Sequence, residues 1–146
     1  MKIGFAPYLS MEINKYSSII NLVEKRLIEN LSSKSYGNGI LEIYIGIICI
    51  GPEYKQFFKP RKPKYTSDNK LYVKDGEEHT LYKTFEYDIL LDYKKFSLAT
   101  ELHFRTMLED EILNSLRVFD DMKSKIKDFD AEKFKKDLTN ILTIKS

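Results

Sequence analysis

The sequence of this chain is poor in the residues that form disulfides, metal sites and redox centres. Its 146 residues include one cysteine, two histidines and no tryptophan. A single cysteine excludes an internal disulfide and a cysteine-based zinc site of the usual spacing. Cys49 lies in an apolar run, where a buried and unreactive thiol is the expected state. His79 and His103 have no partner at metal-ligand spacing, so the sequence predicts neither a metal nor another cofactor.

The chain also lacks a long apolar run and an excess of charge of either sign. Its longest apolar run, residues 43–50, is far shorter than the roughly 20 residues that cross a bilayer. The N-terminal segment contains no continuous apolar stretch of the secretory type. A net charge of +2, from 24 basic and 22 acidic residues, provides no overall field for nucleic acid or an anionic membrane. We therefore expect a cytoplasmic protein without membrane contact, whose charged partners are recognised by local patches.

The signatures of common enzyme classes are missing as well. The glycines are scattered and form no Walker-type phosphate loop, and neither a GxSxG nor an HExxH motif occurs. A content of 42% hydrophobic and 32% charged residues is typical of a folded protein. A chain of this length buries roughly two-thirds of its unfolded surface, which suffices for a core without disulfides. The sequence therefore predicts one domain spanning residues 1–146, with no enzymatic activity.

The clearest pattern that is present is the alternation within residues 79–96, HTLYKTFEYDILLDYKKF. Apolar side chains recur at every second position, and the alternate positions are mostly threonine, glutamate or aspartate. This period of two predicts a half-buried β-strand with one face on a core and the other in water, as in an antiparallel sheet. The water-facing side would contain three carboxylates, those of Glu86, Asp88 and Asp92.

The other segments predict the elements around this strand. Residues 2–9, which include Pro7, predict an edge strand or an extended arm, and the β-branched run over 40–50 predicts a central strand covered on both faces. Apolar residues at helical spacing predict a helix over 14–31, a long helix over 101–126, and a short terminal helix with Asp128 or Asp130 as its N-cap. We therefore predict an α+β fold, in which an antiparallel sheet of three to five strands is covered by the N-terminal helix and the long helix of the C-terminal half.

Residues 53–78 break these patterns, and two interpretations of their basic part remain open. Residues 54–65 interleave basic with aromatic side chains, a combination that single-stranded nucleic-acid binders use. This makes a small nucleic-acid-binding module the alternative function, with the candidate contacts Phe57, Lys59, Arg61, Lys62 and Tyr65. We favour a basic loop whose phenylalanines tuck into the core, because acidic residues follow at once. Further along, Asp75-Gly76 predicts the turn of a hairpin whose first strand lies around 71–73.

The carboxylates of the 79–96 strand have three interpretations. They could bind a cation or act as an acid and base pair, they could form an ordinary solvated sheet face, or they could dock a basic partner. In the third interpretation they act together with the acidic turn 109–111 of the long helix. The candidate partner-binding residues are then Glu86, Asp88, Asp92, Glu109 and Asp110.

The order of the predicted elements resembles a known group of proteins. A helix near the N-terminus is followed by an apolar strand after Tyr36-Gly37, a variable middle, and the strand 85–96, FEYDILLDYKKF, before a long helix. This layout resembles the small bacterial immunity proteins of polymorphic and contact-dependent toxin systems. The resemblance implies a toxin inhibitor that binds and blocks the C-terminal domain of a cognate toxin, often a nuclease, inside the producing cell, without doing chemistry itself. These families share no common binding site, so the resemblance assigns no site residue and no oligomeric state.

Overall fold

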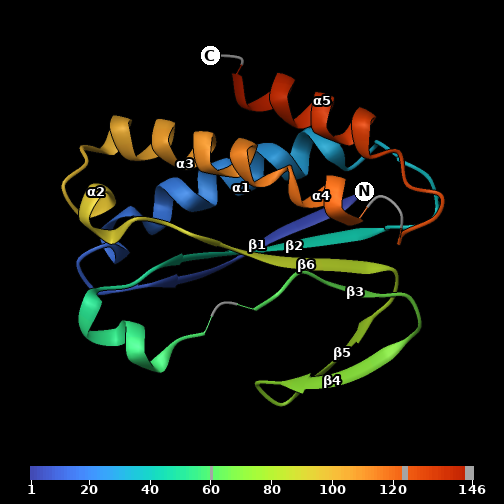
Figure 1. Cartoon of the computed structure of the whole chain (residues 1–146), viewed down its shortest axis with the longest axis horizontal. Coiled ribbons are helices and arrows are strands. Elements are labelled where there is room, and N and C mark those ends of the chain that lie inside the picture. The colour runs from blue at the N-terminus through green and yellow to red at the C-terminus, as the bar shows by residue number, and fades with distance from the viewer. Residues whose placement is uncertain (60, 123–124, 144–146) are drawn as a thin grey trace.

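A four-stranded sheet lies at the centre of the computed structural model, which describes residues 1–59, 61–122 and 125–143, without the side chain of Phe57. Along the chain, with η for 3-10 helices, the elements are β1 (Lys2–Leu9), η1 (Asn14–Tyr16), α1 (Ser17–Leu31), β2 (Glu42–Cys49), η2 (Pro52–Phe57), β3 (Lys64–Thr66), β4 (Lys70–Lys74), β5 (Glu77–Leu81), β6 (Thr84–Leu90), α2 (Tyr93–Ser97), α3 (Glu101–Ser115), α4 (Val118–Met122) and α5 (Ala131–Thr143). The sheet has the strand order β1-β2-β6-β3, and β4 and β5 form a separate hairpin. The helices α1, α3 and α5 lie above the sheet, and the hairpin lies below it (Figure 1).

The longer strands of the sheet run parallel, which corrects the antiparallel sheet that the sequence led us to predict. β1 pairs with β2, and β2 pairs with β6, in parallel registers that place Ile3 beside Ile43 and Ile45 beside Tyr87. The three-residue β3 runs antiparallel to β6. The prediction was wrong because the polar side of β6 is not an open wet face: the segment before β3 covers it and pairs Arg61 with Asp88. The mixed α and β composition and the two predicted helices are confirmed.

The range 79–96 forms parts of several elements, so its prediction as a single strand was wrong. β5 ends at Leu81, and Lys83, with φ of 47°, turns the chain before β6 begins. At the other end the Asp92 carboxylate accepts hydrogen bonds from the main-chain N–H groups of Lys94 and Lys95 and starts α2. The alternation within β6 is confirmed, because Phe85, Tyr87 and Ile89 are all buried in the main core.

The helices above the sheet largely follow the predicted apolar stripes. The long helix is shorter than predicted, since α3 ends at Ser115 and a turn separates it from α4. The stripe nevertheless continues through the turn, because Leu116 and Phe119 are buried. α5 begins after Asp130, whose carboxylate accepts a hydrogen bond from the Lys133 N–H at 3.1 Å, so Asp130 is the N-cap of the two that the sequence suggested.

An aromatic cluster joins the C-terminal helices to the sheet. Phe119 of α4 contacts the rings of Phe85, Tyr87, Phe129 and Phe134, with centroids 5.1–6.0 Å apart. Such tilted and edge-on pairs add about 0.5–1.5 kcal/mol each to the area that the rings bury. Because the partners come from β6, α5 and the segment before α5, this cluster fixes the helix layer on the sheet.

The two predicted minor features, the edge strand and the hairpin, are both present. β1 lies at the edge of the sheet, where Pro7 offers no N–H and the Phe5 N–H donates to Glu24 of α1 at 2.6 Å. Both features blunt this edge against pairing with another chain. In the hairpin, Asp75 and Gly76 have positive φ angles of 52° and 79°, as a two-residue turn of type I′ requires.

The buried Cys49 thiol and the buried Tyr87 phenol make the stability of the fold depend on pH. Burial raises the pKa of the Cys49 thiol to about 11, and the Asp92 charge adds to this shift. Burial also raises the pKa of the Tyr87 phenol to about 12. Ordinary values are about 8.5 and about 10, so the stabilisation is fully present below those values and is lost as pH rises through the folded ones. We expect the free energy of unfolding in urea to fall from about pH 9 upward.

The variant Cys49→Ala should remove the part of this fall that begins near the ordinary thiol pKa and keep the later part. Urea titrations of both chains across the alkaline range measure the difference in slope. Identical slopes in the two chains would contradict the assigned role of the thiol.

Candidate partner-binding face

The lower face of the sheet, defined as the side opposite the helices, is formed by the even-numbered positions of β1, β2 and β6. Its middle is occupied by the Asp88 carboxylate, whose side chain is 2% exposed. Gly46 of β2 lies beside Asp88 in the register, and a Cβ at position 46 would lie 2.2 Å from Asp88 Oδ1. Glycine at this position therefore makes the room that the carboxylate occupies.

Arg61 pairs with this carboxylate. It thereby connects the basic residues of the candidate nucleic-acid site with the acidic residues of the candidate partner-binding site, which the sequence analysis treated as alternatives. The Arg61 main-chain N–H donates to Asp88 Oδ2 at 2.9 Å, and Nη2 donates to Oδ1 at 3.1 Å. Nη1 lies 3.5 Å from the Glu86 carboxylate. The hydrogen bond to Asp88 raises the pKa of the Arg61 guanidinium, and both carboxylates support the shift. Arg61 of the basic segment, residues 54–65, thus neutralises part of the acidic charge on β6.

The remaining predicted carboxylates lie apart from this pair. Asp92 caps α2 at the end of the strand. Glu109 lies between Arg105 and Arg26, with N–O distances of 3.8 Å to each, and burial raises its pKa against the opposing effect of these two arginines. Asp110 is exposed on α3. The five predicted residues are therefore not one cluster, and their role in binding stays a prediction.

The other residues of the basic segment have different surroundings. Lys59 and Lys62 are exposed. Tyr65 of β3 donates a hydrogen bond from its hydroxyl to the main-chain carbonyl of Gly39. The side chain of Phe57 and all of Pro60 lie outside the described residues. The structure thus uses Arg61 and Tyr65 of this set in contacts within the chain.

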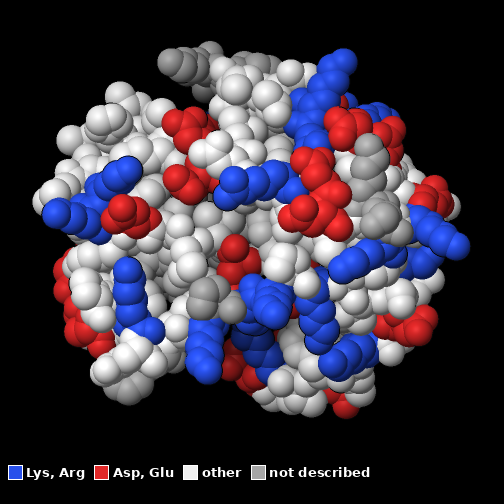
Figure 2. All heavy atoms as spheres, in the orientation of Figure 1, with Lys and Arg blue, Asp and Glu red and all other residues white. Residues whose placement is uncertain are grey.

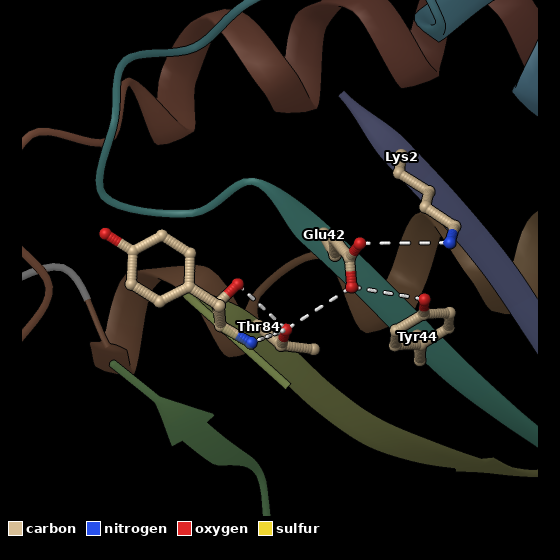
Figure 3. Close-up of polar contacts among 5 residues, drawn as sticks. Lys2, Glu42, Tyr44 and Thr84 are labelled. Carbon is tan, nitrogen blue, oxygen red and sulfur yellow. Dashed lines mark hydrogen bonds and ion pairs between the residues drawn. The ribbon is translucent and has the colours of Figure 1, made fainter. Parts of the chain in front are cut away.

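A second polar network links the three parallel strands near their amino-terminal ends (Figure 3). Glu42 lies at its centre: one carboxylate oxygen is 3.8 Å from the Lys2 ammonium, and the other accepts from the Tyr44 hydroxyl at 3.2 Å and the Thr84 hydroxyl at 3.5 Å. Burial raises the pKa of Tyr44, and the Glu42 charge acts in the same direction. These contacts connect β1, β2 and β6, so the network is part of the framework of the lower face.

An apolar hollow of about 510 Å³ lies near the carboxyl ends of β2 and β6. Phe58 and Leu90 line it, and Leu90 is 52% exposed. Phe58 also contacts the ring of Tyr8 on β1, with centroids 6.0 Å apart. Partly exposed aromatic and aliphatic side chains around a hollow are typical of the centre of a protein–protein interface.

A groove of about 320 Å³ follows the outer side of β6, and we call it the edge groove. Its lining consists of Pro63, Tyr87, Asp88, Ile89, Leu90, Glu111, Asn114, Ser115, Arg117, Val118 and Asp121. Figure 2, in the orientation of Figure 1, shows this side of the molecule. Acidic side chains among a few basic ones gather above β6, and basic side chains gather below it (Figure 2).

The sequence indicated part of the edge groove but not the groove itself. Glu111 belongs to the acidic turn 109–111, whereas Asp121 was missed. Their helices are separate, and the turn after Ser115 brings Asp121 to the same groove. The helical period over 101–126 gave no signal for that turn, because apolar residues continue through it.

The pairing of Arg61 with Asp88 predicts a stability effect that a double-mutant cycle can measure. Arg61→Ala should lower the free energy of unfolding by about 1–2 kcal/mol, because it leaves a covered carboxylate with fewer charged donors; the exposure of Arg61, 62%, keeps the value at the low end. Asp88→Asn should reduce the further effect of Arg61→Ala to a few tenths of a kcal/mol. Additive effects of the two substitutions would contradict the pairing.

The described residues contain no group of three or more His, Cys, Asp or Glu side chains able to hold a metal ion. Within residues 1–59, 61–122 and 125–143, no helix is long and apolar enough to cross a membrane. Each buried side-chain N or O atom in this part of the chain has a hydrogen-bond partner.

Comparison with known proteins gives one finding. The family model described as Immunity protein 44 matches residues 1–144. No curated protein and no solved structure matches the chain.

Proposed function

The chain belongs to the Immunity protein 44 family, and from this premise we propose that it binds the C-terminal domain of a cognate bacterial toxin and blocks its active site or substrate path. The match over residues 1–144 is the observation on which the proposal rests. A protein of this kind works by surface complementarity and does no chemistry itself. Its place of action would be the cell that makes the toxin, in a polymorphic or contact-dependent toxin system.

The lower face and the adjoining edge groove supply the features that such binding needs. The apolar hollow beside Leu90 offers a place for a partner side chain, and such anchors contribute most of the affinity in many interfaces. The hairpin adds Leu71 and Val73, which are 61% and 67% exposed. Apolar side chains exposed this far favour a surface that a partner covers.

A nuclease is the toxin class that the charges favour. A nuclease binds phosphates in a basic groove, and carboxylates such as Asp110, Glu111 and Asp121 would take the place of phosphates there. Glu86, Asp88, Asp92 and Glu109 remain candidates for the same role, although each already has a partner within this chain. Reversal of an exposed charge at the interface should slow association and leave dissociation nearly unchanged.

Affinity purification of the tagged chain from its own cells tests the proposal. The proposal expects a one-to-one complex with the C-terminal domain of a large secreted protein encoded by the gene immediately upstream. The alternative, a nucleic-acid-binding module, expects nucleic acid that salt releases and that is lost from the variant Lys59→Ala/Lys62→Ala. Recovery of nucleic acid without the toxin domain would refute the immunity function.

A further inference from the structure

Over its second half, the outer edge of β6 pairs with no strand in the part of the chain that the structure describes. The Leu91 N–H donates to the Ile48 carbonyl of β2 at 2.8 Å, so the odd-numbered residues of β6 bond toward β2 and the even-numbered ones face outward. β3 pairs with the outward groups of Thr84 and Glu86 and extends no further along β6. Among the described residues, no strand pairs with the outward main-chain groups of Asp88 and Leu90.

The edge groove lies along these unpaired groups. Four consecutive residues of β6, 87–90, line it, and α3 and α4 form its upper wall. Pro63 lines the groove near the end of β3. An extended segment that entered this groove would meet one main-chain N–H and one C=O from each of Asp88 and Leu90, which is the geometry by which a peptide adds a strand to a sheet.

The charges around the edge groove indicate which kind of extended segment it can bind. Glu111 and Asp121 line its upper wall together with Arg117, and the Asp88 carboxylate is already paired with Arg61 below. Lys59 and Lys62 are exposed in the segment that precedes β3, and this segment runs below the sheet (Figure 1). Because side chains of an added strand alternate between the two faces, its helix-facing positions would meet carboxylates and its lower positions would meet lysines.

We infer that the open half of the β6 edge pairs with an extended segment of the toxin domain, one with Lys or Arg at its helix-facing positions. The inference rests on the proposed function and names the part of the partner that the face recognises. A second copy of this chain fits less well. Two copies paired through this edge about a twofold axis normal to the sheet would place their helix layers on the same side and bring acidic wall against acidic wall.

The main-chain contribution is tested by a pair of variants at one position. Leu90→Pro removes the outward N–H and leaves the bonds to β2, because the Leu90 N–H faces away from β2; Leu90→Ala removes the side chain and keeps the N–H. In binding assays with the toxin domain encoded by the upstream gene, Leu90→Pro should bind about five- to tenfold more weakly than Leu90→Ala. Equal affinities of the two variants would overturn the strand pairing.

The charge contribution is tested with a matched control on the same helix. Glu111→Lys/Asp121→Lys should lower the association rate with the same toxin domain by about tenfold or more at low salt, and the loss should shrink as salt is added. Glu101→Lys reverses an exposed charge at the start of the same helix, outside the groove lining, and should have a much smaller effect. An equal loss from Glu101→Lys would assign the effect to the overall charge of the chain and overturn the groove contact.

Hydrogen exchange of the unmodified chain keeps the test independent of any variant that fails to fold. The Leu90 amide should exchange readily in the free chain and become at least about tenfold slower in the complex. Unchanged exchange within a stable complex would overturn the strand pairing and leave the proposed function standing. Absence of any complex with the upstream toxin domain would overturn both. Protection of Leu90 in a dimer of the chain alone would assign the edge to a second copy.

Discussion

Replacement of Phe119 by alanine should lower the free energy of unfolding by about 3–5 kcal/mol. Phe119 is 2% exposed and contacts four other rings, so truncation leaves a cavity at the junction of α4, α5 and β6. The surrounding rings come from separate elements and can collapse into the cavity only by shifting a helix. Urea denaturation followed by circular dichroism measures the effect.

Leu98→Ala is the matched control for this prediction. Leu98 is a large apolar residue of the same chain that is 80% exposed, and its truncation should change stability by no more than about 0.5 kcal/mol. A loss below about 1 kcal/mol for Phe119→Ala, with the control unchanged, would contradict the central place of Phe119 in the core.

Replacement of Gly39 by alanine should destabilise the chain by about 2–4 kcal/mol. A Cβ at position 39 would lie 2.0 Å from the Lys127 carbonyl oxygen and 2.8 Å from that of Asp128. Both are main-chain atoms that cannot rotate away, and the Gly39 N–H donates to the Asp128 carbonyl at 2.7 Å. Relief of the clash therefore breaks this bond and separates the segment before β2 from the segment before α5.

Gly76→Ala separates this clash from the general cost of replacing glycine. Gly76 lies in the hairpin turn with φ of 79°, and nothing lies within 4 Å of an added Cβ. Its replacement should cost about 1 kcal/mol through backbone strain alone. Thermal melts of the two variants compare the effects, and equal losses would show that the Gly39 contact contributes nothing of its own.

The sequence correctly predicted the elements that are determined by short-range sequence patterns. Helical spacing located α1, α3 and α5, and the Asp75-Gly76 pair located the hairpin, because both signals lie within a few residues of the structure they produce. The predicted antiparallel strand direction was wrong because the direction depends on which distant strand pairs with β6. β6 pairs with β2, more than thirty residues earlier in the chain, and no local pattern encodes that choice.

Prediction of the candidate site was also limited by contacts between residues that are distant in the sequence. Arg61 and Asp88 were each identified from their neighbours in sequence, yet they were assigned to opposing functions because nothing at a separation of 27 residues showed that they touch. The role of Gly46 could not be predicted from the sequence either, because this glycine leaves space for Asp88 on the adjacent strand. The open edge of β6 results from the short length of β3. The prolines of the basic segment made β3 itself hard to predict from the sequence.

The most direct test of the immunity function is the survival of cells that produce the toxin domain of the upstream gene together with this chain. The account predicts that cells with an excess of the folded chain grow normally, and that cells without it stop growing. It also predicts that Leu90→Pro protects less well than Leu90→Ala at equal protein levels. Growth arrest despite an excess of the folded, unmodified chain would contradict the account.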